Sequence, residues 1–333
     1  MKTGKRLTAA IDLGSKHSVA CWVDEEGEEV ARERIRSNCV TLERVFGSQP
    51  PLRIAIETGG HSNWVARRLR AMGHEVIVAD ARRLKVLWDT RSKDDKRDAR
   101  FLAQIAARWP DLLCPVEPRW EETERKRSML RMRDTVVRAR VKLINCVRGV
   151  LASFGERLPA MSTEAFALKA RPLHLTAQIK VYDKRVRELC NGRYREQTRR
   201  LLTIPGVGPQ TALTFVLELD GDVNRLRGSR AAGAMVGLRP MRRDSGESHP
   251  ELGITKEGNQ MLRRYLVQCA HYMLGRQGLD CALKRWGLKL AGTSKRGKKR
   301  AAVATARKLA VLLHTLWRKD VDFDPMIGLE QAA

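Results

Sequence analysis

Short apolar runs separated by turn residues dominate the first 80 positions of the chain. They predict five strands: one in RLTAAIDLG (6–14), two around the EEG turn of HSVACWVDEEGEEVARERI (17–35), one in RIAIET (53–58) and one in EVIVAD (75–80). Apolar positions at helical spacing in HSNWVARRLRAMG predict a helix that ends at Gly73. Three β segments followed by alternating helix and strand favour a mixed sheet flanked by helices.

A second helix is predicted in DDKRDARFLAQIAARW (94–109), and Pro110 ends it. Its spacing puts four apolar side chains on one face: Phe101, Leu102, Ile105 and Ala106. The order of elements is compatible with an α/β ribonuclease-H-like domain, although the pattern alone also fits other α/β folds.

Beyond Trp120 the pattern becomes helical as far as about Arg200. Apolar residues recur at helical spacing at Val137, Val141, Ile144, Val147 and Leu151. This pattern predicts a long helical hairpin, broken near SFGERLPA (153–160). Residues 119–200 hold 21 Lys and Arg against 9 Asp and Glu. The hairpin could therefore be a spacer or dimerisation coil, a basic arm on nucleic acid, or both.

The remaining segment, from Leu201, is predicted to be mainly helical. IPGVG (204–208) resembles a helix-hairpin-helix turn, in which Gly206 and Gly208 let backbone N–H groups approach phosphate; a plain helix–helix turn is the alternative. A Gly- and Arg-rich loop and a helix (260–274) follow. The tract SKRGKKR (294–300) precedes a final helix, either as a solvated loop or as a contact for phosphate. Its basic residues are Lys295, Arg296, Lys298, Lys299 and Arg300.

Composition restricts the partners and the cellular compartment. The net charge of +26 and the pI near 10.5 favour a polyanionic partner, either DNA or RNA. Seven scattered cysteines without CxxC spacing favour a reducing cytoplasm over disulfides or a zinc site. Neither a signal peptide nor a membrane-spanning segment is expected.

Four acidic residues are the first candidate site. Asp12 and Glu57 each follow an apolar run, and Asp95 and Asp98 lie three apart at the start of a predicted helix, where they share a face. Four clustered carboxylates repel one another unless a cation binds, so a site for Mg²⁺ or Mn²⁺ is predicted. Alternatively, these residues are caps and turn residues. An actin-like ATPase would need further nucleotide-binding loops, and we find none convincing.

The loop RPMRRDSGES is the second candidate site. Arg239, Arg242 and Arg243 surround Ser245, with Asp244 directly before it. Arginines can clamp a phosphate, whereas a serine needs activation before it attacks phosphorus. The residues alone therefore favour an anion-binding loop, with a nucleophilic serine as the alternative.

Together these motifs, in this order, resemble the insertion-sequence-110 family of transposases and the related site-specific DNA invertases. The N-terminal motifs are the first-strand Asp12, IETGG with Glu57, and K-x-D-x-x-D-A-R from Lys93 to Arg100. The C-terminal motifs are L-x-x-IPGVG, the segment from Met235 to Pro240, the triplet Asp244–Ser245–Gly246, and RKLAVLLHTLWRKDVDFDP.

The resemblance implies a fold and a division of the chain. Residues 1–118 would form a RuvC-like, ribonuclease-H-fold domain, 119–200 the helical hairpin or coiled coil, and 201–333 a mainly α transposase domain. Asp12, Glu57, Asp95 and Asp98 would bind Mg²⁺ or Mn²⁺, and Ser245 would join covalently to DNA. Members of the family use both centres in a composite site assembled between subunits of a dimer or tetramer.

The resemblance also implies the partners. These would be the element ends, the target DNA and a guide RNA from the element's non-coding end, with specificity residing in base pairing. Two departures matter: Asp94 could replace Asp95 as a ligand, and Arg243 stands where relatives often have an aromatic residue. A protein-guided invertase, a metal-dependent Holliday-junction resolvase and a non-catalytic binding scaffold remain alternatives.

Overall fold

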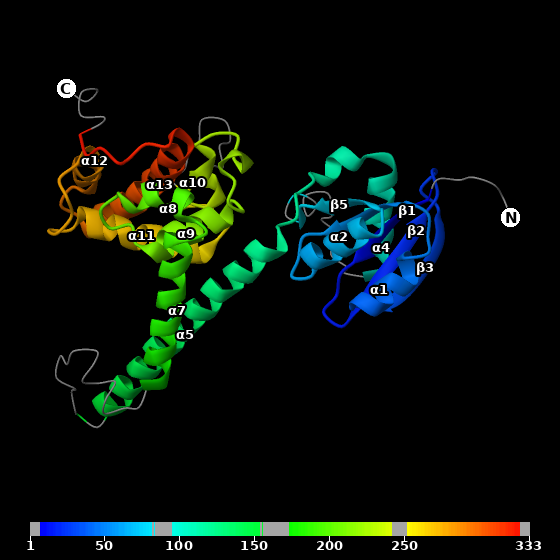
Figure 1. The fold of residues 1–333 in the computed structure, drawn as a ribbon, viewed down its shortest axis with the longest axis horizontal. Helices are drawn as coiled ribbons and strands as arrows, with labels where there is room; N and C mark the ends of the chain where they lie inside the picture. Colours follow the sequence, from blue (N-terminus) through cyan, green and yellow to red (C-terminus); the bar gives the residue numbers. More distant parts are fainter. Residues whose placement is uncertain are drawn as a thin grey trace. The chain divides into compact units, whose positions relative to one another are not determined.

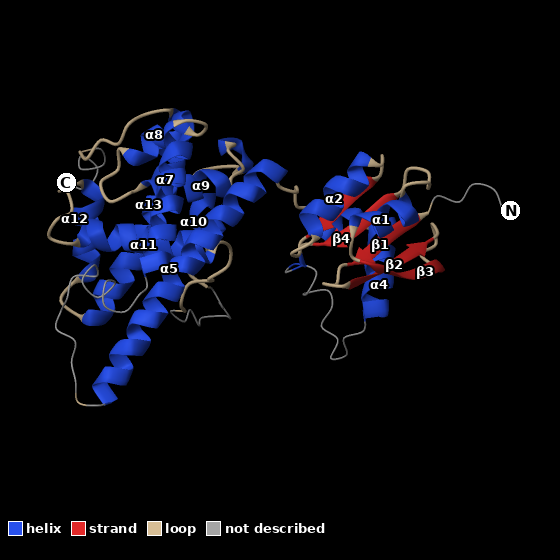
Figure 2. Cartoon of the chain, turned by 60° about the horizontal axis from the view of Figure 1, so that its bottom comes forward, coloured by secondary structure: helices blue, strands red, loops and turns tan. Residues whose placement is uncertain are grey.

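The computed structural model describes residues 7–81, 83, 95–153, 155, 173–241 and 252–326. They form two compact units, Met1–Glu121 and Glu122–Ala333. The strands of the sheet lie in the first unit, and the second is built of helices (Figure 2). None of the helices in the described ranges has the length and apolar character that crossing a membrane requires.

The N-terminal unit is built on a five-stranded mixed sheet of order β3-β2-β1-β4-β5. Its strands are β1 (Thr8–Asp12), β2 (His17–Val23), β3 (Glu29–Arg36), β4 (Arg53–Glu57) and β5 (Glu75–Ala79). The first three are antiparallel, and β4 and β5 continue parallel to β1. The five predicted strands are confirmed, and this strand order is consistent with a ribonuclease-H-like fold.

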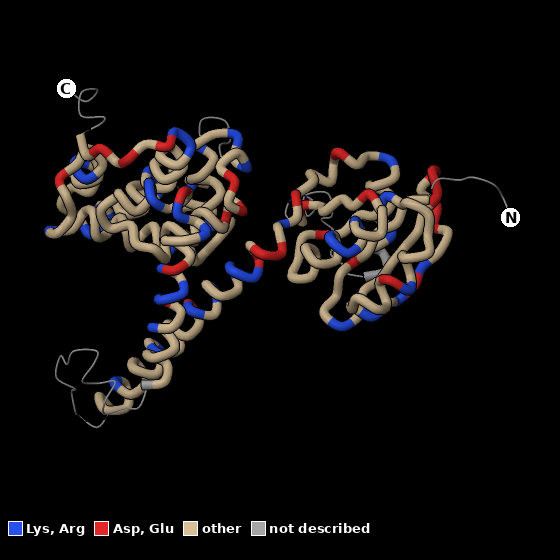
Figure 3. Tube along the Cα trace, in the orientation of Figure 1, with Lys and Arg blue, Asp and Glu red and all other residues tan. Residues whose placement is uncertain are grey.

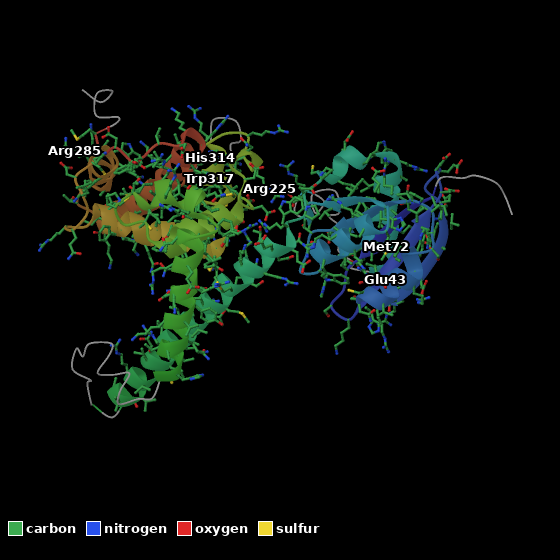
Figure 4. The ribbon with its side chains drawn as sticks, viewed as in Figure 1. Glu43, Met72, Arg225, Arg285, His314 and Trp317 are labelled. Atoms are coloured by element: carbon green, nitrogen blue, oxygen red, sulfur yellow. The ribbon has the colours of Figure 1, made fainter. Side chains whose placement is uncertain are left out.

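Helices cover both faces of this sheet (Figure 1). On one face, α1 (Cys39–Phe46) and α2 (Ser62–Ala71) pack on alternate strand residues such as Ile11 and Ile56. Glu43 of α1, labelled in Figure 4, forms an ion pair with Arg68 of α2. The other face carries α4 (Asp95–Arg108) and the 3-10 helix η1 (Pro110–Leu113).

The structure differs from the predicted elements at α1 and on one face of α4. Helix α1 was not predicted, although Asn38 caps it by accepting a hydrogen bond from the Thr41 N–H at 2.8 Å. In α4, Phe101 is 37% exposed and does not share the buried face of Leu102. The residues of α4 that face the sheet are mainly alanines. The strand residues opposite them also include alanines, so the helix can approach the sheet closely.

The C-terminal unit begins with a helical hairpin of α5 (Glu121–Ser153) and α7 (Leu173–Asn191). Arg133 Nε donates to Asp183 Oδ1 at 2.6 Å, and Arg140 Nη1 donates to Thr176 Oγ1 at 3.4 Å. Residue numbers therefore rise along α5 where those of the contacting residues fall along α7, so the two helices are antiparallel. Lys and Arg positions recur along both helices (Figure 3).

The remaining helices pack on α13 (Lys295–Lys319), α9 through the ring contact of its Phe215 with Trp317. They are α8 (Arg195–Leu202), α9 (Pro209–Glu218), η2 (Val223–Arg225), α10 (Ala231–Met235), α11 (Gln260–Leu274) and α12 (Ala282–Ala291). His314 of α13, labelled in Figure 4, lies 3.0 Å from Ser229 Oγ and 2.9 Å from the Val223 carbonyl. These contacts hold the η2 segment against the central helix. The C-terminal region is therefore mainly helical, as predicted.

Candidate active site and nucleic-acid surfaces

Asp12 and Glu57 end neighbouring parallel strands. The register pairs Ala10 of β1 with Ala55 of β4. Two residues further along each strand, Asp12 and Glu57 come side by side at the carboxyl edge of the sheet. Because side chains alternate between the two faces of a strand, both carboxylates lie on the same face as the two alanines.

Helix α4 covers that same face of the sheet. Its residues Ala99, Leu102 and Ala103 are buried in one cluster with Ala10 and Ala55. The predicted acidic helix and the two strand-end carboxylates therefore belong to the same layer of the unit.

The direction of α4 places its acidic end beside the strand ends. The Gln104 side-chain amide donates to a carbonyl of the β2–β3 turn at 2.8 Å, and Arg53 Nη1 donates to the Ala106 carbonyl at 3.4 Å. The carboxyl end of α4 thus lies at the amino edge of the sheet. Rises of about 1.5 Å per helical residue and about 3.3 Å per strand residue then bring Asp98 to roughly the level of Glu57.

These carboxylates suit a hard divalent cation. Asp12, Glu57 and Asp98 are each half-buried, and Asp95 begins α4, although its side chain and Asp94 lie outside the described parts. Aspartates in a first turn are also favoured by the helix dipole. Among the side chains that are described, which include Asp12, Glu57 and Asp98, no three His, Cys, Asp or Glu residues lie close enough to hold a metal ion. The four-residue metal site that includes Asp95 therefore stays a prediction.

Asp80 is a further carboxylate at this edge, directly after β5. Ala79, the residue before it, belongs to the face covered by α4, so strand alternation turns Asp80 toward the opposite face. Arg83 Nε lies 3.9 Å from Asp80 Oδ2. Asp80 resembles the predicted ligands in sequence context and differs from them in orientation.

The loop predicted to carry the nucleophile has a well-defined base. Ser245, Arg242 and Arg243 lie outside the described residues, whereas both arms of the loop lie within them. Three backbone hydrogen bonds join the arms: Met241 N–H to the Gly253 carbonyl at 2.8 Å, Thr255 N–H to Arg239 at 2.9 Å, and Lys256 N–H to Gly237 at 3.0 Å. The arms thus form a short antiparallel ladder that fixes where the loop leaves the helical unit.

Two glycines and an arginine build this base, and this role was not predicted for any of the three. Gly237 and Gly258 have φ of 66° and 75°, and an added Cβ would lie 2.0 Å and 1.8 Å from backbone carbonyl oxygens. Only glycine fits such positions. Arg263 Nη1 donates to the carbonyls of Val236 and Glu257 at 2.9 and 3.0 Å. The glycines in VGLRP and KEGN were the available signal, and the exposed Arg239 lies directly beside this base.

The IPGVG segment is a tight turn between α8 and α9. Gly206 has φ of 89°, and a Cβ there would lie 2.6 Å from Cδ1 of Tyr272. Gly208 is the N-cap of α9, followed by Pro209 at the first helical position. The glycines therefore let the turn close tightly, and phosphate contact through Gly206 and Gly208 stays a prediction.

The basic tract is helical, which corrects the prediction that it precedes the final helix. Ser294 caps α13 by accepting a hydrogen bond from the Gly297 N–H at 2.9 Å. All five basic residues of the tract (Lys295, Arg296, Lys298, Lys299 and Arg300) are exposed in the first two turns. Their charge adds to the positive end of the helix dipole, which makes this end attractive to phosphate.

Replacing Lys298 and Lys299 together by glutamine is expected to reduce the salt dependence of DNA binding. Each lost phosphate contact lowers the slope of log K against log salt by about 0.9, so the double variant should lose about 1.8. Titrations of duplex DNA at several salt concentrations measure the slope. The matched control, Arg318→Gln with Lys319→Gln, removes the same charge from the other end of α13. A slope that Lys298→Gln with Lys299→Gln leaves unchanged would show that this end does not contact phosphate.

Two protein-family models match the chain. The model described as "Transposase IS116/IS110/IS902 family" matches residues 198–284. A second model, for DEDD transposases of IS110 and described as "Transposase", matches residues 9–155. The first match contains the IPGVG turn and the Ser245 loop, and the second contains the sheet, α4 and α5.

Individual relatives resemble the chain over most of its length. "Transposase for insertion sequence element IS1328" of Yersinia enterocolitica is 29% identical over 284 residues, which are 80% of this chain and 83% of the relative. "Transposase for insertion sequence element IS1111A" of Coxiella burnetii is 28% identical over 329 residues, 92% of this chain and 88% of the relative.

Proposed function

The chain belongs to the IS116/IS110/IS902 family of transposases, and we propose that it moves its insertion sequence by RNA-guided DNA strand exchange. DNA cleavage and joining are the activities of the family, and a DEDD domain implies a divalent metal. The proposal adds a specific metal site, a covalent intermediate and a guide. The observation that carries it is the alignment of the Asp12 and Glu57 strand ends with the first turns of α4.

The proposed metal ligands are Asp12, Glu57, Asp95 and Asp98, and Mg²⁺ or Mn²⁺ is the ion that such oxygen donors prefer. A bound divalent ion supplies charge stabilisation at the scissile phosphate and its leaving oxygen. The protein's own contribution is to bring the carboxyl ends of two strands and the first turns of one helix to the same layer of the domain.

Ser245 is the proposed nucleophile. Its Oγ attacks phosphorus and loses its proton, a P–Oγ bond forms, and the bond from phosphorus to one deoxyribose oxygen breaks. That oxygen takes up a proton and leaves as a hydroxyl. A deoxyribose hydroxyl of the exchanged strand then attacks the phosphoserine and releases Ser245, so rejoining needs no outside energy source. Arg239, Arg242 and Arg243 would neutralise the phosphate charge.

We also propose the finer architecture implied by these motifs. The N-terminal domain (1–118) would be RuvC-like, which the sheet order supports. The hairpin (119–200) and the transposase domain (201–333) would hold nucleic-acid backbones, with IPGVG acting as a helix-hairpin-helix turn. Exposed apolar residues on α5, such as Val141 and Val150, support assembly into a homodimer or tetramer.

Reconstitution with RNA tests the guide. Expression of the gene with its native flanks should co-purify one enriched RNA from the adjacent non-coding DNA. Strand exchange between element ends and target DNA should then require the protein, that RNA and Mg²⁺ together. Strand exchange without the RNA would identify a protein-guided invertase. Cleavage of branched DNA without rejoining would instead identify a Holliday-junction resolvase.

A further inference from the structure

A pocket of about 540 Å³ lies in the C-terminal unit beside the IPGVG turn. Its walls come from that turn and from α5, α9 and α11. The polar side chains that matter are Arg133, Gln210, Tyr265, Gln268 and Tyr272. Its volume lies within the range of about 300–1,000 Å³ in which proteins bind small organic groups.

Arg133, the cation among the described residues that line the pocket, has its charge neutralised. Arg133 Nε donates to Asp183 Oδ1 at 2.6 Å, and the Gln210 side-chain amide donates to the same oxygen at 2.9 Å. The guanidinium charge is thus compensated by a carboxylate from α7. A pocket built this way does not offer an unpaired positive charge for a phosphate, and it favours a neutral polar group.

Neutral hydrogen-bonding groups complete the interior. The Tyr265 hydroxyl is buried next to the Arg133 guanidinium and makes no hydrogen bond of good geometry within the described parts of the chain. Burial raises the pKa of Tyr265, so its hydroxyl stays protonated and able to donate. Gln268 adds an exposed amide that can donate and accept.

Tyr272 supplies a flat aromatic wall at the mouth. It is 45% exposed, and its ring lies so close to the Gly206 backbone that an added Cβ would meet Cδ1 at 2.6 Å. The absence of a side chain at Gly206 therefore leaves the space that the Tyr272 ring occupies. Tyr265, Gln268 and Tyr272 follow each other at i, i+3 and i+7 along one face of α11.

We propose that this pocket binds an unstacked base of a single-stranded nucleic acid. The inference rests on the proposed function, because a guide RNA and strand exchange supply such single strands. The base would stack on Tyr272, while the exposed Gln268 amide bonds to its edge and Tyr265 lines the wall of the pocket. Aromatic stacking combined with hydrogen bonds to the base edge is the usual chemistry of single-strand recognition. The base can come from RNA or from separated DNA.

The test uses the full-length protein and short single-stranded RNA and DNA oligonucleotides that contain 2-aminopurine, whose fluorescence falls when it stacks. Tyr272→Ala should weaken binding by about 5- to 100-fold and abolish the quenching. Tyr272→Phe keeps the ring and should bind within about twofold of the parent protein. Tyr182→Ala is the matched control, since Tyr182 on α7 is half-buried and lies outside the pocket lining.

Each outcome decides the proposal. A larger loss with RNA identifies the guide as the source, a larger loss with DNA identifies the separated strand, and equal losses identify recognition of the base alone. Unchanged binding and quenching in Tyr272→Ala, or equal losses in Tyr182→Ala, would overturn the pocket assignment. The proposed transposition chemistry would survive that result, because strand exchange is assayed separately with the parent protein.

Discussion

Asp12→Asn is expected to reduce DNA strand exchange by at least about 1,000-fold, which corresponds to a loss of several kcal/mol of transition-state stabilisation. The substitution removes one negative oxygen donor from the carboxyl edge of β1 and leaves the size of the side chain unchanged. Asp12 lies opposite Glu57 on the face that carries α4. The loss should therefore fall on metal binding rather than on folding. Quantification of joined products in the presence of Mg²⁺ measures it.

A thermal measurement separates metal binding from activity. Clustered carboxylates repel one another without a cation, so the metal-free Asp12→Asn protein should unfold at the same temperature as its parent or higher. The parent should gain stability on adding Mg²⁺, and the variant should gain less. Asp80→Asn is the matched control, because Asp80 follows the neighbouring β5 and turns to the other face. If Asp80→Asn were equally inactive, the assignment of the metal face would be wrong.

The strand ends of the candidate site could be predicted from the sequence because they depend on a local pattern. Short apolar runs defined β1 and β4, and the turn residues after them marked Asp12 and Glu57 as strand-end side chains. Their shared face required the register between the strands, which is a contact between distant segments. The direction of α4 likewise depends on the long-range bond between Arg53 and the Ala106 carbonyl.

The basic tract was misassigned because two local signals oppose each other. Ser294 is a good N-cap, yet positive charges in the first turns of a helix are disfavoured by its dipole. The helix starts there nonetheless because Ala301, Ala302 and Thr305 are buried on its inner face and hold the whole segment helical. The unfavourable charge at the helix start is consistent with a site kept for anion binding.

The residues that support the base of the Ser245 loop could not be predicted from the sequence. The motif around Ser245 suggested the chemistry, whereas the residues that support the loop lie up to eighteen positions away along the chain, at Arg263. Burial lowers the pKa of Arg263, and its guanidinium is held by two backbone carbonyls. Such an interaction carries no sequence pattern, because any buried carbonyl pair can accept from an arginine.

Ser245→Ala is expected to abolish both strand exchange and the covalent protein–DNA adduct, while duplex binding stays within about twofold of the parent because phosphate contacts supply most of the affinity. The alanine lacks the oxygen that would form the bond to phosphorus, so no other loop residue restores rejoining. Labelled DNA that stays with the protein under denaturing conditions measures the adduct. Ser248→Ala is the matched control, since it removes a second hydroxyl from the same loop.

The two centres can be ordered by combining the variants with the adduct assay. If the metal site helps to break the scissile bond, Asp12→Asn should also fail to form the adduct, whereas a metal needed only for rejoining would let the adduct accumulate. Normal strand exchange in Ser245→Ala would contradict the phosphoserine. Cleavage that persists in Ser245→Ala but disappears in Asp12→Asn would assign hydrolysis to the acidic centre, because water then replaces the serine as nucleophile.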